Sequence, residues 1–394
     1  MMTIQEQADQ LIRDEGFGPG PMGELTPRIH AAVLAGQGDM AESTLRIPNA
    51  NYTDPAIAAR ELATTFAAPL LVGPRLMVKH PGEFVTMTLV DTPVLVVRDE
   101  KRARVFVNVC RHRGARVAEG AGCARRFTCS YHAWTYDTSG ALVGMPGREG
   151  FDDRDPDTLG LIELPSEERA GFLWALRDPH GTLDLDAHLG HFETELDSWG
   201  VDYEIAAVME LELGANWKCG LEAFQETYHF PYVHRNSIVG MGTISNITTF
   251  DQFGRHHRLG VPLASIGHDS EPAKGENAVS IYYFYPFAVM AASPLGGELL
   301  QFWPGTTPTT SMVRHSILSR TPLKDPAVRE FFDSYVPLIQ AVIRDEDAVV
   351  IESSGIGLAA GHSDTIIGRN EIGCQAAHRQ ILADLGQQNL DTGS

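Results

Sequence analysis

One stretch of 28 residues decides the fold: positions 110–137 read CRHRGARVAEGAGCARRFTCSYHAWTYD. It carries Cys110-x-His112 and Cys129-x-x-His132, with sixteen residues between His112 and Cys129. Two thiolates and two imidazoles paired in this way suit a two-iron cluster, in which the cysteines hold one iron and the histidines hold the other. Imidazoles in place of two thiolates raise the reduction potential of such a cluster. The stretch therefore predicts a [2Fe–2S] cluster and a chain that handles electrons.

A zinc site is the first alternative for these four residues, because a Cys2His2 zinc site has the same ligand set. Such sites usually read C-x2-4-C followed by H-x3-5-H, whereas each half here carries one Cys and one His. Four unrelated core residues are a weaker alternative. Cys123 lies between the halves without a His two or three residues on, so we expect a buried or partly buried thiol there rather than a ligand.

Length and composition set broad limits. A chain of 394 residues favours two domains. No run approaches the eighteen apolar residues of a membrane span, and the N-terminus lacks an apolar signal segment. Five cysteines, two of them assigned to a cluster, leave no disulfide framework, so we expect a reducing cytoplasm. The net charge of −20 argues against a nucleic-acid partner.

The basic residues are concentrated around the cluster segment. Between Arg98 and Arg126 nine basic residues face only Asp99, Glu100 and Glu119, a local excess of about six positive charges. This excess could steer an acidic redox protein towards the cluster. Alternatively, the arginines offset the negative charge of the cluster or pair with nearby carboxylates.

The remaining sequence predicts an α+β chain. A helix over 54–66 opens with Asp54 as N-cap and Pro55 in the first turn. Short β-like runs predict a small antiparallel β domain around the cluster loops: 84–90, 94–97, 105–107 and 172–175. Beyond residue 176 we expect a larger domain with helices packed on an antiparallel sheet. Its predicted helices cover 185–199, 216–230 and 325–352, and its predicted strands cover 279–285 and 313–318.

A second candidate metal site lies at positions 216–234, NWKCGLEAFQETYHFPYVH. In a helix, three of its side chains fall at i, i+4 and i+7 on one face: Glu222, Glu226 and His229. His234 would lie off that face, but Pro231 should bend or break the helix and let both imidazoles converge.

Two convergent histidines need a third ligand, and the acidic run 345–347 supplies candidates. An apolar stripe through Ile339 and Ile343 passes through position 346 or 347, so either Glu346 or Asp347 should face inward. Two His and one carboxylate form the facial triad of non-haem Fe(II) oxygenases. Such histidines are often only hydrogen-bonded, and the inward acid could instead pair with an arginine.

The motifs resemble those of the Rieske non-haem iron oxygenase α subunits, the ring-hydroxylating dioxygenases and related monooxygenases. CRHRG at 110–114 and CSYHAWTYD at 129–137 resemble the two cluster loops. The usual second loop reads CPYHGW, so Ser130 and Ala133 depart from it. The family's NWK and E-N-F-x-E-x-Y-H-x4-H match 216–218 and 222–234, with Ala223 in place of Asn. Its late E-D-x4-E pattern matches Glu346, Asp347 and Glu352.

The resemblance implies a layout and a set of ligands. It implies a Rieske domain over 45–175 and a START-like catalytic domain over 1–44 and 176–394. Cys110, His112, Cys129 and His132 would bind the [2Fe–2S] cluster. His229, His234 and Asp347 would bind mononuclear Fe(II), with Glu346 as the fallback for Asp347. It also implies a homotrimer, in which the catalytic residue Glu226 bridges His229 and the His132 of a neighbouring chain.

The implied activity is that of a terminal oxygenase. It would hydroxylate, dihydroxylate or oxidatively demethylate an organic substrate with O2. No Rossmann, flavin or plant-type ferredoxin motif is present, so a separate reductase, with or without a ferredoxin, would supply electrons from NAD(P)H. An aromatic or otherwise apolar substrate is expected, as in aromatic hydrocarbon catabolism, with a quaternary amine as the alternative. The alternative from another class is a non-enzymatic Rieske electron carrier.

Apolar and aromatic residues of the 236–318 region either line a substrate pocket or form core: Ile238, Val239, Met241, Ile244, Tyr283, Phe284, Phe287, Met290 and Phe302.

Overall fold

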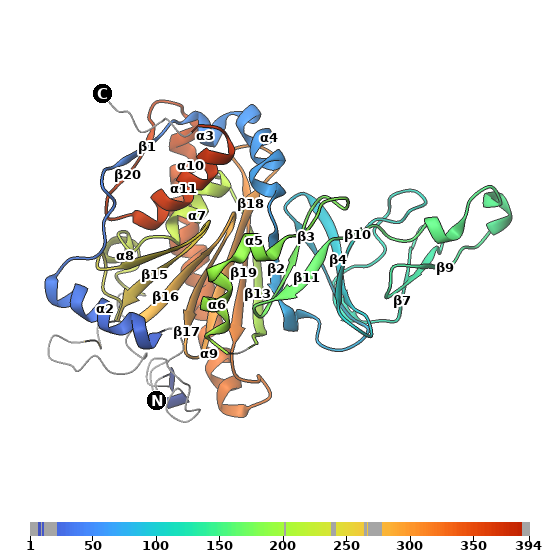
Figure 1. Cartoon of the computed structure of the whole chain (residues 1–394), viewed down its shortest axis with the longest axis horizontal. Coiled ribbons are helices and arrows are strands. Elements are labelled where there is room, and N and C mark those ends of the chain that lie inside the picture. Colours follow the sequence, from blue (N-terminus) through green and yellow to red (C-terminus); the bar gives the residue numbers. More distant parts are fainter. Residues whose placement is uncertain are drawn as a thin grey trace. The chain divides into compact units, whose positions relative to one another are not determined.

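The computed structural model describes residues 7–8, 10–11, 22–200, 202–237, 242–263, 266 and 278–387. The chain forms two compact units, which Figure 1 colours along the sequence. One unit is Phe66–Leu185, and the other combines Met1–Thr65 with Asp186–Ser394.

Three small antiparallel sheets build the unit Phe66–Leu185, in the strand orders β10-β5-β4-β3-β6, β11-β12-β2 and β7-β8-β9. All four strands expected there from the sequence are confirmed, as β3, β4, β5 and β12. The strands of the unit are β2 (Leu70–Pro74), β3 (Glu83–Leu89), β4 (Thr92–Arg98), β5 (Ala103–Val107), β6 (Ala121–Cys123), β7 (Arg126–Thr128), β8 (Thr135–Asp137), β9 (Leu142–Gly144), β10 (Glu163–Leu164), β11 (Ser166–Arg169) and β12 (Phe172–Ala175).

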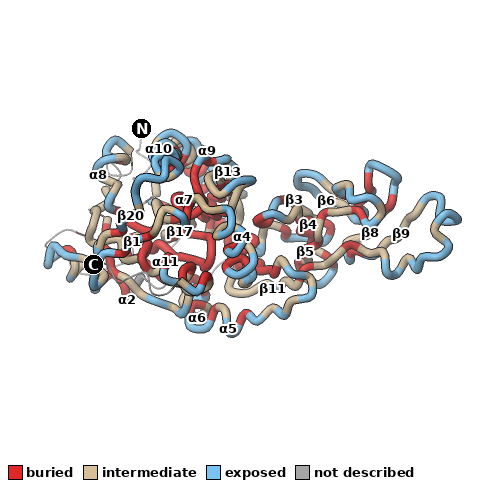
Figure 2. The backbone as a smooth tube through the Cα atoms, turned by 90° about the horizontal axis from the view of Figure 1, so that it is seen from above, coloured by how far each residue is buried: buried red, intermediate tan, exposed pale blue. Residues whose placement is uncertain are grey.

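The other unit is built on a seven-stranded antiparallel sheet in the order β13-β19-β18-β17-β16-β15-β14. The strands expected over 279–285 and 313–318 are confirmed as β16 and β19. Figure 2 marks β17 of this sheet among the buried backbone. The bounds are β13 (Glu204–Leu213), β14 (Thr249–Phe253), β15 (His256–Pro262), β16 (Ala278–Phe284), β17 (Ala288–Ser293), β18 (Gly296–Pro304) and β19 (Ser311–Ser319).

Helices contact this sheet along its length: α2 and α11 against β15, α7 against β18 and β19, and α9 against β13. The helices of the unit are α2 (Met22–Ala35), α3 (Ala50–Thr53), α4 (Pro55–Ala63), α6 (His191–Asp197), α7 (Trp217–Ala223), α8 (Phe230–Val233), α9 (Pro326–Val342), α10 (Ala348–Ala359) and α11 (Ile372–Asp384). Helices on an antiparallel sheet confirm the predicted α+β class. The N-cap at Asp54 is also confirmed, because its side chain accepts a hydrogen bond from the Ala56 amide at 2.7 Å.

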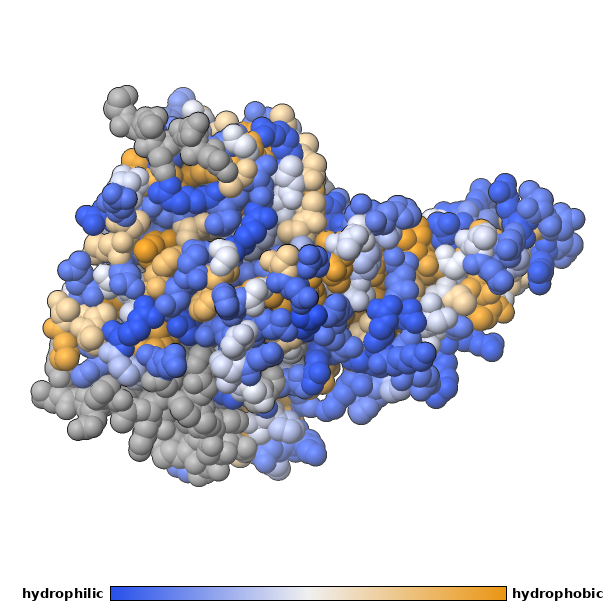
Figure 3. Space-filling model, in the orientation of Figure 1, coloured by the Kyte–Doolittle hydropathy of each residue, from blue (hydrophilic) through white to orange (hydrophobic). Residues whose placement is uncertain are grey.

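The division between the compact units differs from the boundaries expected at residues 45 and 175. β1 (Leu45–Ile47) pairs with β20 (Thr365–Ile367), so residues 45–65 cluster with the seven-stranded sheet. This long-range pairing leaves no local sequence signal. In the described ranges, no helix is long and apolar enough to cross a membrane. The face drawn in Figure 3 is mostly hydrophilic, with its apolar side chains scattered.

Candidate metal centres

The second cluster loop is the turn between β7 and β8. The strands pair Thr128 with Thr135, and the Cys129 amide donates to the Trp134 carbonyl at 2.8 Å. The Ala133 amide donates back to the Cys129 carbonyl at 2.9 Å. This closure requires a φ of +57° at Ala133, in the left-handed region that favours glycine. The departure from the CPYHGW loop at Ala133 therefore carries a backbone strain.

The first cluster loop follows β5 and is tied to the second through Tyr136. The Cys110 amide donates to the Ala115 carbonyl at 2.7 Å, and Gly114 closes the turn at a φ of +78°. The Tyr136 hydroxyl accepts a hydrogen bond from the Arg111 amide at 3.0 Å and lies 3.4 Å from the Cys110 sulfur. Because Tyr136 lies on β8, this contact fixes one loop against the other.

The two loops bring together the four residues predicted to bind the cluster. Cys110 and Cys129 are buried in one apolar cluster, and both are free thiols. The rings of His112 and His132 lie 4.6 Å apart, and His132 is exposed. Buried sulfurs beneath a pair of outer imidazoles suit a cluster whose histidine-bound iron lies nearer to solvent.

The expectation of a buried Cys123 is wrong. Cys123 ends β6, which is an edge strand, and all three residues of that strand are exposed. Its partner strand β3 lies on one side only, so the thiol has no second strand to cover it.

The charge excess around the loops is smaller than the sequence suggests. Three of the nine basic side chains form ion pairs at 2.5–2.7 Å: Arg98–Glu168, Arg102–Glu163 and Arg104–Asp99. Glu163 and Glu168 lie outside the 98–126 segment, so the local count missed them. For three arginines these ion pairs support the alternative that they pair with carboxylates. Four other arginines are exposed: Arg111, Arg113, Arg125 and Arg126.

The second centre begins at a turn, where a continuous helix was expected. The prediction of a helix over 216–230 is wrong, because α7 ends at Ala223. Glu226 and His229 meet because the Glu226 carboxylate accepts hydrogen bonds from the amides of Tyr228 and His229, the latter at 3.2 Å. Side chains that bind nearby amides compete with helix formation.

Pro231 also acts differently from the expectation. It lies in the first turn of the separate helix α8, a position that proline favours, and does not interrupt a longer helix. His234 follows as the C-cap of that helix. One helical turn therefore separates the two imidazoles and points both at one spot.

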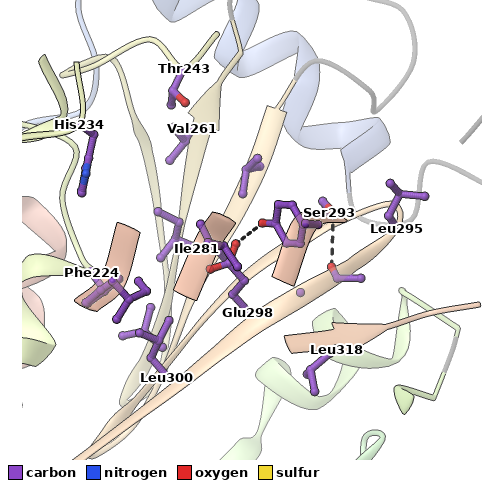
Figure 4. A pocket seen from close by; sticks show the side chains of 18 of the residues that line it. Phe224, His234, Thr243, Val261, Ile281, Ser293, Leu295, Glu298, Leu300 and Leu318 are labelled. Atoms are coloured by element: carbon purple, nitrogen blue, oxygen red, sulfur yellow. Dashed lines mark hydrogen bonds between the residues drawn. The ribbon is translucent and has the colours of Figure 1, made fainter. Parts of the chain in front are cut away.

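Three ligand-type atoms converge there (Figure 4 labels His234 at the pocket wall). The Nε2 atoms of His229 and His234 lie 3.1 Å apart. The Oδ1 atom of Asp347 lies 3.0 Å from His234 Nε2 and 3.6 Å from His229 Nε2. Metal–ligand bonds of about 2.1 Å at right angles place neighbouring ligand atoms about 3 Å apart. The separations therefore fit three adjacent positions around one ion.

Each imidazole is oriented by a carboxylate on its outer nitrogen. Glu226 accepts from His229 Nδ1, and Glu346 accepts from His234 Nδ1 at 2.7 Å. With Nδ1 as the donor, each Nε2 presents a lone pair to the centre. Two lone pairs and a carboxylate oxygen repel one another unless a cation lies between them. The donor set therefore fits a metal ion.

The pKa values show that the carboxylates attract positive charge at this spot. Burial disfavours a charged imidazole, but hydrogen bonds to Asp347 and Glu226 outweigh it and raise the pKa of His229 to about 9. Burial would raise the pKa of Asp347, yet its contacts with His229 and His234 lower it. Asp347 is buried, and its Oδ2 has no hydrogen-bond partner among the described residues. A charged, buried carboxylate needs a positive partner, and either a protonated imidazole or a metal ion can supply it.

Both Glu346 and Asp347 contact the His234 ring, whereas the sequence predicted that only one of the two acids would face inward. A π-helical turn over Ile343–Asp347 separates α9 from α10. A wider turn reduces the angle between successive side chains, so neighbouring acids can reach opposite nitrogens of one ring. Ser237 holds Glu346 from behind, with its hydroxyl donating at 2.6 Å. The α-helical period could not reveal this arrangement.

Glu222 does not line up with Glu226 and His229. Its carboxylate accepts from the Tyr52 hydroxyl at 2.7 Å and lies 2.6 Å from His378 Nε2. The sequence reasoning missed His378 because it lies on α11, far along the chain. This network joins α3, α7 and α11 and fixes the helix that precedes the metal centre.

A fully buried ion pair supports the same helix. Lys218 Nζ lies 2.5 Å from Glu61 Oε1, and Trp217 Nε1 donates to Glu61 Oε2 at 2.9 Å. Both charged side chains are buried. Buried charges persist where they are paired and hydrogen-bonded.

A cavity of about 260 Å³ opens at the three-residue centre and runs over the sheet. Apart from the centre itself, its walls are mostly apolar side chains from α9 and from β15 to β18. Most of the residues that were expected either in the pocket or in the core belong to the core. Tyr283, Phe284, Phe287, Met290 and Phe302 are buried core outside the described lining, and Ile238, Val239 and Met241 lie outside the described residues.

Comparison with known proteins identifies both parts. A family model described as "Ring hydroxylating alpha subunit (catalytic domain)" matches residues 196–387. A model described as "Rieske [2Fe-2S] domain" matches residues 69–156. These matches confirm the family resemblance.

Curated relatives include aromatic dioxygenases and amine monooxygenases. The alpha subunit of biphenyl 2,3-dioxygenase from Rhodococcus jostii is 35% identical over 198 residues, 48% of this chain and 43% of that protein. The oxygenase subunit of carnitine monooxygenase from Acinetobacter baumannii is 30% identical over 192 residues, 48% of this chain and 52% of that protein. The chain thus spans about half the length of the curated relatives it matches.

Solved structures share the fold. Naphthalene 1,2-dioxygenase from Rhodococcus sp., bound to indole, has a TM-score of 0.70 at 19% identity, over 89% of this chain and 95% of that one. A quaternary ammonium Rieske monooxygenase bound to L-carnitine has a TM-score of 0.72 at 21% identity, over 89% and 97%. The predicted fold class is confirmed.

Proposed function

We propose that this chain, which belongs to the family of Rieske oxygenase alpha subunits, is a terminal oxygenase component that oxidises an organic substrate with O2. When bound, the [2Fe–2S] cluster carries electrons and the mononuclear iron activates O2. The convergence of His229 Nε2, His234 Nε2 and Asp347 Oδ1 carries the proposal. A simple Rieske electron carrier would have no use for this second set of ligands.

Four residues are proposed to hold the cluster, with Cys110 and Cys129 on one iron and His112 and His132 on the other. Their support is the pair of buried free thiols and the pair of neighbouring imidazoles. Tyr136 would keep the two loops in register through the Arg111 amide. All five cysteines are free, in keeping with the proposed cytoplasmic location.

His229, His234 and Asp347 are proposed to hold the iron. Glu226 and Glu346 keep each Nδ1 protonated, so both Nε2 atoms stay available. Three protein ligands leave other positions open for O2 and water. The apolar cavity walls would exclude bulk water from the substrate.

Glu226 is proposed to carry the link between subunits. In a homotrimer, it would contact His229 of its own chain and His132 of the partner subunit. The exposed position of His132 supports this role, since an exposed imidazole can reach a second chain. A solved quaternary ammonium Rieske monooxygenase of the same fold is described with inter-subunit electron transfer. A separate reductase, with or without a ferredoxin, would supply the electrons.

The cavity lining favours an aromatic or otherwise apolar substrate, because its described walls are mainly aliphatic and phenyl side chains. A quaternary amine is the second candidate, supported by the likeness to carnitine and glycine betaine monooxygenases. Hydroxylation, dihydroxylation and demethylation are all compatible with such a centre.

A substrate screen tests the proposal. The purified chain, loaded with iron and cluster, is supplied with a generic reductase and NADH, and O2 uptake is measured together with product. Product in proportion to O2 for an apolar aromatic compound supports the proposal. Reduction of the cluster without product from either substrate class would favour the electron carrier.

A further inference from the structure

Glu298 is a carboxylate in a part of the cavity that is otherwise lined by uncharged and mostly apolar side chains. Apart from the metal centre, it is the one charged residue among the described residues that line the cavity. On the sheet it lies in a row with Ala291 of β17 and Ile317 of β19, and Ala291 pairs in turn with Ile281 of β16. A carboxylate among these neighbours is costly unless hydrogen bonds offset its lost hydration.

Two side chains contact the carboxylate, and one of them forms a hydrogen bond with it. The Tyr335 hydroxyl donates to Glu298 Oε1, and His315 Nε2 lies 3.3 Å from Glu298 Oε2. Burial and the nearby Glu298 raise the pKa of Tyr335, so its hydroxyl remains a donor. A carboxylate offers about four acceptor positions, and the Tyr335 hydroxyl occupies one of them. His315 Nε2 lies near Oε2 without donating a hydrogen bond. The Glu298 side chain is 16% exposed, so acceptor capacity is left towards the cavity.

The position of Glu298 separates it from the metal centre. Its partner Tyr335 precedes Asp347 by twelve residues on the continuous helical segment from α9 to the π turn, which is about 18 Å along a helix axis. Phe331, Phe332 and Ile339 line the cavity from the same helix. Figure 4 shows Glu298 well apart from His234, with Ile281 and Leu300 nearby. A ligand touching both places must be elongated.

We propose that Glu298 is a specificity-determining residue that accepts a hydrogen bond from a hydroxyl or protonated amine at the distal end of an elongated, otherwise apolar substrate. This inference rests on the proposed function for the role of the cavity. Glu298 selects substrates that carry a hydrogen-bond donor, which the apolar walls cannot do. A bare hydrocarbon would leave the acceptor positions of the carboxylate unpaired.

Equilibrium binding of four matched probes to the holoenzyme tests the inference, with calorimetry and no reductase present. The probes are biphenyl, 4-phenylphenol, 4-phenylbenzylamine and its N-trimethyl derivative. We expect 4-phenylphenol or 4-phenylbenzylamine to bind at least about tenfold more tightly than biphenyl. Whichever probe shows the preference identifies the donor as a hydroxyl or an ammonium group.

Variants assign the preference to Glu298. In Glu298→Leu the donor probe and biphenyl should bind equally, with biphenyl as tight as before. Glu298→Gln keeps the shape and a carbonyl acceptor. It should halve the logarithm of the affinity ratio between the donor probe and biphenyl. Glu212→Gln, an exposed acid on β13 away from the cavity, should retain all of it.

Three results would overturn the inference. These are an unchanged preference in both Glu298 variants, binding of the trimethylammonium probe as tight as that of the preferred donor probe, or no binding of any probe below about 1 mM. Because no turnover is involved, failure of the oxygenase reaction would leave these ratios untouched and would be seen only in the product assay.

Discussion

The imidazole of His234 is held from behind by Glu346, whose Oε2 lies 2.7 Å from Nδ1. The contact exists because a π-helical turn sets two successive acids around one ring. A carboxylate on the outer nitrogen fixes the tautomer and makes the inner nitrogen a stronger ligand.

Removing the charge behind His234 should weaken iron binding. We expect Glu346→Gln to lower the affinity for Fe(II) by about 10- to 100-fold, the usual effect of losing such a partner. Competition with a chelator measures it. Asp345→Asn is the matched control, because Asp345 is the neighbouring exposed acid and forms its ion pair with the adjacent Arg344. Equal losses in the two variants would contradict the orienting role.

The link between the two centres depends on Glu226. Glu226→Gln should leave the cluster spectrum close to that of the unaltered chain, and should almost abolish product formation even when Fe(II) is supplied in excess. The amide cannot replace the carboxylate in contacts with two imidazoles. Rapid reduction of the cluster followed by product analysis measures this effect. Turnover close to that of the unaltered chain would contradict the bridging role of Glu226.

The strained residue of the second cluster loop predicts a gain in stability. Ala133 has a φ of +57°, so Ala133→Gly should raise the free energy of unfolding by about 1 kcal/mol. Urea unfolding of the holoprotein measures it. The control is Ala121→Gly on the exposed strand β6, where glycine should destabilise by about 0.5 kcal/mol. The same sign in both variants would contradict the assigned strain.

The buried pair beneath α7 predicts a large and non-additive loss. Lys218→Met leaves Glu61 charged and buried, and should lower the free energy of unfolding by about 3–5 kcal/mol. Adding Glu61→Gln should restore part of that loss, since no isolated charge remains. Denaturant unfolding of the single and double variants gives the coupling. Additive losses would show that the two charges do not stabilise each other.

The sequence predicted which candidate ligand residues come together better than it predicted the path of the chain between them. The spacing of Cys110, His112, Cys129 and His132 is local, and so is that of His229 and His234. Helical periodicity failed at residues 224–229, because the Glu226 carboxylate binds the amides that a helix would use. It failed again at Ile343–Asp347, since a π turn has another period.

Long-range partners were beyond prediction from one sequence. Glu222 meets Tyr52 and His378, more than 150 residues away on either side. Similarly, Arg98 and Arg102 form ion pairs with Glu168 and Glu163, which lie on other strands. Such pairs depend on strand order and helix packing, which a linear pattern does not contain.

Iron content tests the central claim of two separate centres most directly. After anaerobic reconstitution with Fe(II) and sulfide, the unaltered chain should contain about three iron atoms, two in the cluster and one at the ligand triad. His234→Ala should contain about two, with the cluster spectrum intact. About two iron atoms in both proteins would contradict the account, because no iron would then be held by His229, His234 and Asp347.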